Sequence, residues 1–81
     1  MSFKEKIISL IKENIEREVE ISLDSDLRND LAIDSFGMLM IINAIEDEFS
    51  ITIKDTEFEG INTVADIVKN LRDKYPGIGE K

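Results

Sequence analysis

Two residue types that carry much of enzyme and metal chemistry are missing from this chain of 81 residues, which contains no cysteine and no histidine. Without cysteine there is no disulfide, no thiol nucleophile and no cysteine metal site. Without either residue, the usual nucleophile–base pairs and most transition-metal sites are excluded. Hydrolytic chemistry would have to rest on carboxylates alone, and the sequence shows no pocket motif for them. We therefore expect a protein that is not an enzyme and holds no metal.

Basic residues and long apolar runs are also scarce. Ten basic residues stand against 18 acidic ones, which gives a formal charge of −8. This balance disfavours nucleic acid and favours partners with basic surfaces, although an acidic surface also serves solubility. No apolar run approaches membrane-spanning length, and the apolar patch at 7–11 is short and flanked by charges, unlike that of a signal peptide. We expect a monomeric cytoplasmic protein without stable membrane insertion.

Apolar residues at helical spacing predict the first two helices. Ser2 and Glu5 have the spacing of a capping box, and the pattern that follows predicts a helix to about residue 17. Asp34 is a good N-cap residue for a second helix, which should run to about Phe49.

Between these helices, residues 18–33 lose their periodicity and predict a long loop. Turn-forming residues favour a short helical turn near 26–29, and the apolar anchors of the loop are Leu27, Leu31 and Ile33. The acidic stretch that begins at Asp24 fails as a calcium loop of the EF-hand type. Arg28, Asn29 and Ser35 occupy the positions where that loop needs an oxygen ligand, glycine and glutamate.

The second half of the chain predicts one short and one long helix. Residues 50–53 alternate like a strand but have no partner strand, so we interpret them as a connector. Residues 55–59 predict a short helix, and Thr63 and Asp66 form a capping box for a helix to about Lys74. We expect a single all-α domain over 1–76, a small up-and-down four-helix bundle with three long helices, and a disordered tail at 77–81.

The second helix carries two faces, and only one of them is needed for the core. Met38, Ile41, Ile42, Ile45 and Phe49 share the core face. The opposite face carries two large apolar residues, Phe36 and Met40, next to Ser35 at the helix start. A serine in the first turn lies where backbone N–H groups and the positive end of the helix dipole favour an attached phosphate. Its plain alternative is an ordinary helix-start residue.

Asp34-Ser35-Phe36 resembles the Asp-Ser-Leu signature of acyl carrier proteins, whose serine is esterified by 4′-phosphopantetheine. The resemblance also covers the length, the acidity, the segment 58–64 and the order of the helical signals. It implies a carrier whose arm is donated by CoA and attached to Ser35. Asp34 would cap the helix and help the transferase to recognise the site. It further implies acyl thioesters that are presented to enzymes of fatty acid, lipid or secondary-metabolite biosynthesis. The implied partners are a phosphopantetheinyl transferase and acyl-loading and acyl-processing enzymes with basic docking patches.

The outer face of the second helix is the candidate docking strip for such partners. It consists of Phe36, Leu39, Met40, Asn43, Glu46 and Asp47. Acids in the last helical turn oppose the dipole at about 0.3–1 kcal/mol each, which favours a docking role over a stabilising one. Carriers of fatty acid synthesis usually have acids where this chain has Gly37 and Met40, and the departure suggests a dedicated carrier. A solvated acidic face with harmless apolar residues is the plain alternative.

The resemblance also suggests that an acyl chain is held between the helices. The candidate lining is Met38, Ile42, Ile45, Val64, Ile67 and Val68. Each buried methylene of the acyl chain would contribute about 0.8 kcal/mol, but a fully packed core explains the same residues equally well. The rival to the carrier as a whole is a small acidic helical adaptor that binds a basic, apolar partner and has no prosthetic group. The sequence leaves the acyl group and the pathway open.

Overall fold

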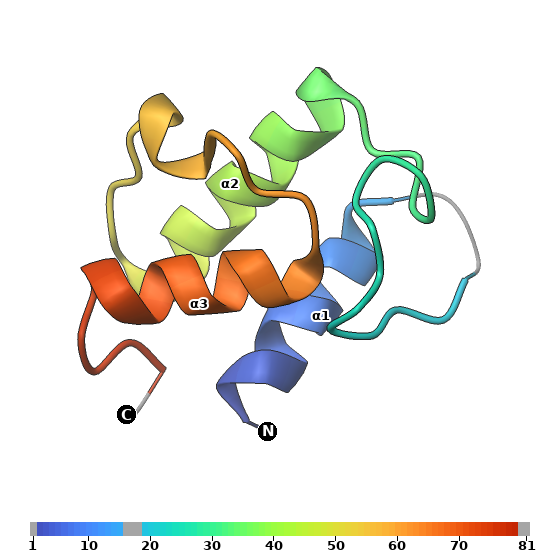
Figure 1. Ribbon diagram of the computed structural model, residues 1–81. Coiled ribbons are helices and arrows are strands. Elements are labelled where there is room, and N and C mark those ends of the chain that lie inside the picture. Colours follow the sequence, from blue (N-terminus) through green and yellow to red (C-terminus); the bar gives the residue numbers. More distant parts are fainter. Residues whose placement is uncertain (1, 16–18, 80–81) are drawn as a thin grey trace.

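The computed structural model describes residues 2–15 and 19–79. Within these ranges the chain forms three α-helices and one short 3₁₀-helix (Figure 1): α1 (Phe3–Glu13), α2 (Ser35–Phe49), η1 (Asp55–Phe58) and α3 (Val64–Lys74). The all-helical class is therefore confirmed, and residues 50–53 form no strand. The short helix predicted at 55–59 corresponds to η1, which is a four-residue 3₁₀-helix and not an α-helix. None of the described helices has the length and apolar character needed to cross a membrane.

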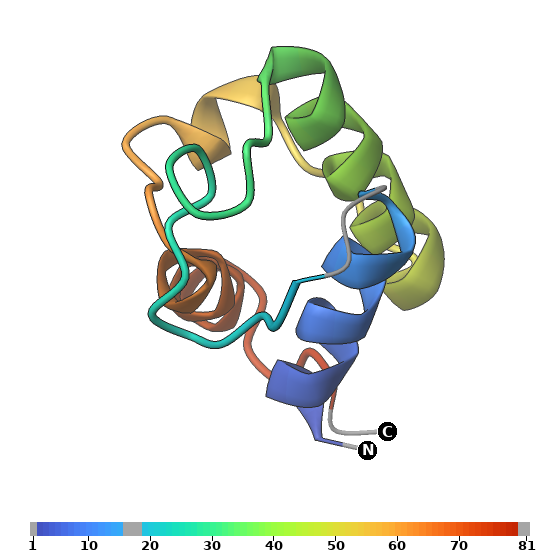
Figure 2. The same cartoon turned by 90° about the vertical axis from the view of Figure 1, so that its right-hand side faces the viewer.

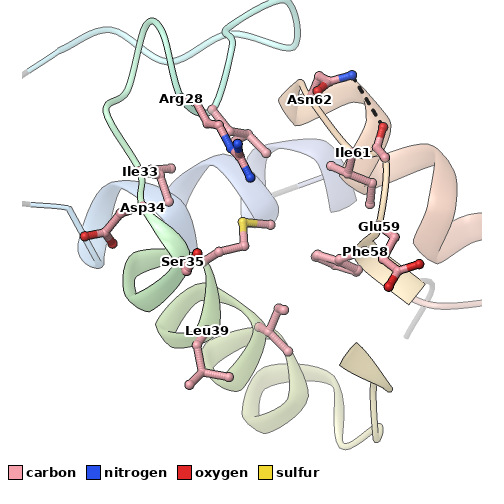
Figure 3. Close-up of a pocket in the computed structure, with 13 residues that line it drawn as sticks. Arg28, Ile33, Asp34, Ser35, Leu39, Phe58, Glu59, Ile61 and Asn62 are labelled. Carbon is pink, nitrogen blue, oxygen red and sulfur yellow. Dashed lines mark hydrogen bonds between the residues drawn. The ribbon is translucent and has the colours of Figure 1, made fainter. Parts of the chain in front are cut away.

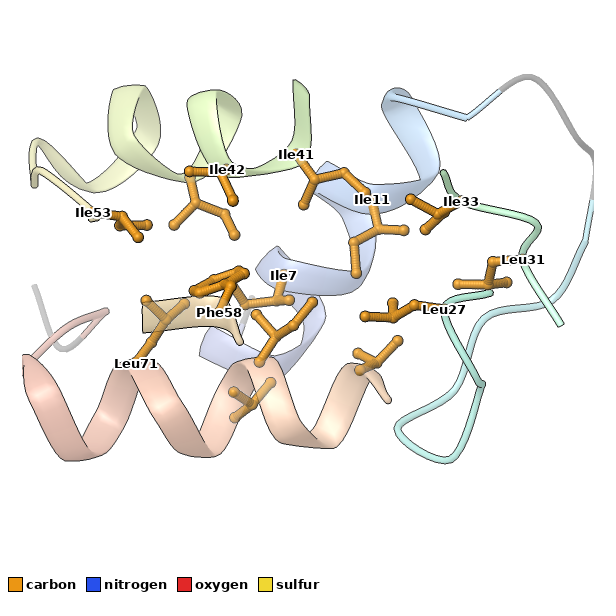
Figure 4. Packing of buried hydrophobic residues seen from close by; sticks show 14 of the residues in the cluster. Ile7, Ile11, Leu27, Leu31, Ile33, Ile41, Ile42, Ile53, Phe58 and Leu71 are labelled. Atoms are coloured by element: carbon orange, nitrogen blue, oxygen red, sulfur yellow. The ribbon is translucent and has the colours of Figure 1, made fainter. Parts of the chain in front are cut away.

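The helices do not alternate in direction as an up-and-down bundle requires. Instead, α2 and α3 both run from the end of the molecule that carries the long loop toward the opposite end (Figures 1 and 4). The reason is the connector over 50–63, which crosses back along the molecule and carries η1 on the way. The connector therefore lies across one face of the core, where it can form part of a site.

Local capping sets where α1 and α3 begin. The Ser2 hydroxyl accepts from the Glu5 amide and the Glu5 carboxylate accepts from the Ser2 amide, which confirms the predicted capping box. Thr63 and Asp66 form the second one. The pKa of Asp66 lies below its usual value, because its carboxylate accepts hydrogen bonds from the amides of Asn62 and Thr63.

Two predicted boundaries were wrong. α1 ends at Glu13, because the Asn14 side chain donates to the Leu10 carbonyl at 2.8 Å and so competes with continued helix. The predicted residues 16 and 17 lie outside the described ranges. Residues 77–79 form a turn and not a disordered tail: the Ile78 amide donates to the Tyr75 carbonyl at 3.0 Å, and the Ile78 side chain packs against the core. Residues 80 and 81 lie outside the described ranges.

One hydrophobic core joins the three helices and the long loop (Figure 4). The fully buried side chains of the helices are Ile7, Ile11, Ile41, Ile45, Val64, Ile67 and Leu71. The three predicted loop anchors, Leu27, Leu31 and Ile33, are buried as well, which confirms them. Because its anchors are core residues, the loop is held against the core up to the start of α2.

The long loop is also hydrogen-bonded to the connector. Figure 2 shows the loop passing beside the start of α3 before it reaches α2. The Leu27 amide donates to the Asn62 carbonyl at 2.8 Å, and the Val64 amide donates to the Ser25 carbonyl at 3.2 Å. The predicted turn near 26–29 is present, and the Asp26 carboxylate accepts hydrogen bonds from the Arg28 and Asn29 amides. The turn and the connector thus form one unit that faces the first turns of α2.

Two polar contacts hold the connector in place at the other end of α2. The Glu46 carboxylate accepts from the Ile53 amide at 2.8 Å. The Tyr75 hydroxyl donates to the Thr52 carbonyl at 2.7 Å, after α3 has ended. These contacts position η1 so that Phe58, only 8% exposed, covers the core.

Candidate attachment site at the start of α2

Ser35 is the first residue of α2, and it is exposed. Asp34 precedes it as N-cap and accepts from the Gly37 amide at 2.7 Å, which confirms the predicted cap. The first backbone bond of the helix runs from the Met38 amide to the Asp34 carbonyl. The amides of Ser35 and Phe36 come before that bond, at the positive end of the helix dipole, where a phosphate is stabilised.

Gly37 allows the first turn of α2 to lie close to the loop. A Cβ at this position would come within 3.2 Å of the Ile33 side chain and 3.3 Å of the capping carboxylate oxygen of Asp34. The absence of a side chain therefore favours both the cap and the loop packing. This accounts for a residue that otherwise costs a helix about 1 kcal/mol relative to alanine.

Ala32, three residues before Ser35, has a left-handed backbone with φ of 54°. This conformation costs a non-glycine residue roughly 1–2 kcal/mol, whereas glycine adopts it freely but loses about 0.5–1 kcal/mol more entropy on folding. We expect Ala32→Gly to raise the stability by about 0.5–1 kcal/mol, or a few degrees in thermal unfolding followed by circular dichroism. Ala44→Gly, inside α2, is the control and should lower the stability by about 1 kcal/mol. Equal losses in both variants would show that Ala32 is not strained.

A cleft of about 650 Å³ opens beside Ser35, between the first turns of α2 and the segment 58–62 (Figure 3). Its apolar lining comes from Leu27, Ile33, Met38, Leu39, Ile42, Phe58 and Ile61. Its polar residues include Arg28, Ser35, Glu59 and Asn62. The volume is in the range of small-molecule sites, and the mix of an apolar lining with a few polar groups is typical of them.

The residues predicted to line an acyl cavity divide between the cleft and the buried core. Met38 and Ile42 line the cleft, but the other four predicted residues, Ile45, Val64, Ile67 and Val68, do not. They are at most 4% exposed and fill the core between the helices. The opposite wall of the cleft is the connector, with Phe58 and Ile61, which the sequence reading did not assign to the cavity. In the sequence, only the resemblance of the segment 58–64 to the carrier family pointed to Phe58 and Ile61.

The candidate docking strip divides into an exposed and an internally bonded part. Phe36, Leu39 and Met40 are 69%, 46% and 41% exposed, and Asn43 and Asp47 are exposed beside them. Glu46 differs, because it is half-buried and its carboxylate binds the Ile53 amide. The structure thus gives Glu46 an internal role that was not predicted. Glu48, which is not part of this strip, pairs with Lys6 at 2.7 Å.

An exposed hydroxyl at the first residue of a helix, with a cleft beside it, is an arrangement suited to a protein that carries a covalently attached group. The chain belongs to the family whose model is described as a phosphopantetheine attachment site, which matches residues 5–71. A similar solved structure is a protein from Mycobacterium tuberculosis that is provisionally assigned as an acyl carrier protein. The two are 28% identical with a TM-score of 0.78, over 89% of this chain and 97% of that one.

Family membership sets the cofactor, which is covalently attached 4′-phosphopantetheine. When bound, the group supplies a terminal thiol, which this cysteine-free chain lacks. The residues at the start of α2 fit such a group, since they offer an exposed hydroxyl, helix N-terminal amides for a phosphate and a neighbouring cation in Arg28. Proteins of this family are carriers that a phosphopantetheinyl transferase modifies and biosynthetic enzymes use.

Proposed function

We propose that Ser35 is the attachment point of the arm and that this protein carries acyl intermediates on it as thioesters. As a cytoplasmic monomer it would present them to enzymes of fatty acid, lipid or secondary-metabolite biosynthesis. The observation that supports this proposal best is the exposure of Ser35 at the first residue of α2, next to a cleft with an apolar lining. Asp34 orders the helix start as its cap and is the proposed recognition residue for the transferase.

Attachment needs little from the protein beyond this geometry. The Ser35 oxygen forms a bond to the phosphorus of the phosphopantetheine portion of CoA, and adenosine 3′,5′-bisphosphate leaves. The hydroxyl proton passes to the transferase, so the chain needs no base of its own. The arm's thiol would then attack the carbonyl carbon of an acyl thioester that a loading enzyme supplies, and the donor's thiol would leave with the proton. The helix would hold the phosphodiester link to Ser35 in a defined place.

Loading of the purified protein tests the proposal. The apo-protein is incubated with CoA, Mg²⁺ and a promiscuous phosphopantetheinyl transferase, then digested and weighed. We expect a single addition of one phosphopantetheinyl group, on the peptide that contains Ser35. No addition, which an adaptor without a prosthetic group predicts, or an addition on another peptide would overturn the proposal.

We also propose that the outer face of α2 docks partner enzymes. Phe36, Leu39 and Met40 supply the apolar contact, and Asn43 and Asp47 lie on the polar side of it. Three large exposed apolar side chains within two turns of Ser35 form a contact patch of the kind that partners cover. Glu46 lies at the edge of this surface, with its carboxylate already engaged. The net charge of −8 favours partners with a basic rim around an apolar centre.

Met40→Glu tests the docking face. Burying a new carboxylate against an apolar contact should weaken binding to the enzyme that acylates the arm by roughly tenfold, or about 1.4 kcal/mol. Titration calorimetry with that enzyme measures the effect. Ser22→Glu adds the same charge on the exposed loop and should leave the affinity nearly unchanged. Unchanged or tighter binding by Met40→Glu would contradict an apolar, dedicated docking face.

A further inference from the structure

Arg28 is the one cationic residue among those that line the cleft beside Ser35. It also lines a smaller hollow of about 360 Å³ together with Ala32, Ile33, Asp34 and Ser35. Figure 3 shows its guanidinium directed from the loop into the space between α2 and the segment 58–62. In a chain of charge −8, a cation at this place calls for an explanation.

The backbone that carries Arg28 is held on both sides. Its own amide donates to the Asp26 carboxylate at 2.9 Å. The next residue back, Leu27, is 3% exposed and bonds through its amide to Asn62 across the cleft. Because Leu27 also accepts from the Ile33 amide at 2.8 Å, the turn is tied to the start of α2 as well. A guanidinium on such a turn is presented to Ser35 with little loss of backbone entropy.

The donors of Arg28 have no carboxylate partner within the described ranges. The ion pair found there joins Lys6 of α1 to Glu48 in the last turn of α2, and neither residue lines the cleft. The carboxylates next to Arg28 in the chain serve the backbone: Asp26 accepts from two amides of the turn, and Asp30 accepts from the Asp26 amide at 2.8 Å. The guanidinium is therefore free to bind an anion placed at Ser35.

We infer that Arg28 binds the phosphodiester of the arm and thereby directs the arm into the cleft. This inference rests on the proposed attachment at Ser35. The phosphodiester carries one negative charge and two free oxygens, which match the paired N–H groups of a guanidinium. The first amides of α2 bind it from the helix side. Met38 and Ile61 would supply an apolar wall for the pantetheine beyond the phosphate, and Arg28 acts as a positioning residue.

This arrangement gives partner enzymes a way to release the arm. A partner with basic residues near Ser35 competes with Arg28 for the same phosphodiester, so docking weakens the contact that holds the arm in the cleft. In the free carrier the arm and its thioester thus stay near the protein surface, and in the docked carrier the arm is released toward the partner. A single exposed ion pair suits this task, because it is weak enough to exchange.

Amide chemical-shift differences between apo- and holo-protein test the inference. Wild type and the variants Arg28→Gln, Arg28→Lys and Arg72→Gln are loaded, and mass spectrometry confirms the single addition before spectra are recorded. Taking holo minus apo for each variant cancels any effect of the substitution on the apo fold. Arg72→Gln removes the same charge at α3, where Arg72 stacks on Phe3, and serves as the matched control.

In wild type we expect holo-minus-apo shifts at Ile61 and Asn62, across the cleft from Ser35. Arg28→Gln should reduce them roughly two- to fivefold, the range expected for an exposed ion pair, and Arg28→Lys should reduce them less. Arg72→Gln should leave them unchanged. About 1 M salt should reduce the wild-type shifts in the same direction as Arg28→Gln.

Shifts of equal size in wild type and Arg28→Gln, or none at Ile61 and Asn62 in wild type, would overturn the inference while leaving attachment at Ser35 intact. An equal reduction by Arg72→Gln would also overturn it, since net charge and not position would then set the effect. Failure of the mass step alone would instead overturn the proposed function.

Discussion

Alanine at position 35 is expected to abolish attachment of the arm completely and to leave the fold intact. The substitution removes the only atom of residue 35 that can form the ester, so the loss should be total and not partial. The helix start should survive, because the capping bond is made by Asp34 to the Gly37 amide and not by Ser35. Exposed substitutions of this kind usually change stability by less than about 0.5 kcal/mol.

Mass spectrometry after loading and thermal unfolding by circular dichroism measure the two halves of this expectation. Ser50→Ala is the matched control: Ser50 is an exposed serine at the other end of the same helix, where the dipole is negative. It should load as wild type does. Loading of Ser35→Ala at the normal rate would place the arm elsewhere, and loss of loading together with loss of helicity would give Ser35 a structural role instead.

The parts of this structure that the sequence predicted correctly depend on residues close together in the chain. The capping boxes at Ser2 and Thr63 and the cap at Asp34 each join residues three positions apart, so spacing alone identifies them. The core face of α2 followed from the helical period, and the loop anchors followed from being the apolar residues in a polar stretch. The same helical period placed Phe36 and Met40 on the opposite face of α2 and so predicted that they are exposed.

The cleft could not be predicted in this way, because its two walls come from distant parts of the chain. Phe58 and Ile61 reach it only because the connector crosses back over the core, and contacts such as Glu46 with Ile53 and Tyr75 with Thr52 hold it there. The helical period predicts that Ile45 and Ile67 point inward. It does not predict whether side chains fill the space between them. In the sequence, Arg28 had only one interpretation, as a residue that does not fit a calcium-binding loop.

Ile45→Ala decides whether that inner space is packed core or acyl cavity. Ile45 is fully buried and lies outside the cleft, so its truncation should leave a void that neighbouring side chains cannot fill. Such changes cost about 2–5 kcal/mol. A domain of this size has about 4–12 kcal/mol of stability in total. We therefore expect unfolding at temperatures lower by roughly 10–25 °C, with partial unfolding at 37 °C at the larger values.

Leu39→Ala is the control within the same helix, because Leu39 lines the cleft and is 46% exposed. Its truncation should cost less than about 1 kcal/mol, since most of the side chain already meets solvent. Thermal and urea unfolding of the apo-proteins measure both variants. If Ile45→Ala cost no more than Leu39→Ala, the space around Ile45 would already be loose. The deeper acyl cavity predicted from the sequence would then be the better description, because side chains around an existing void lose few contacts when one of them is shortened.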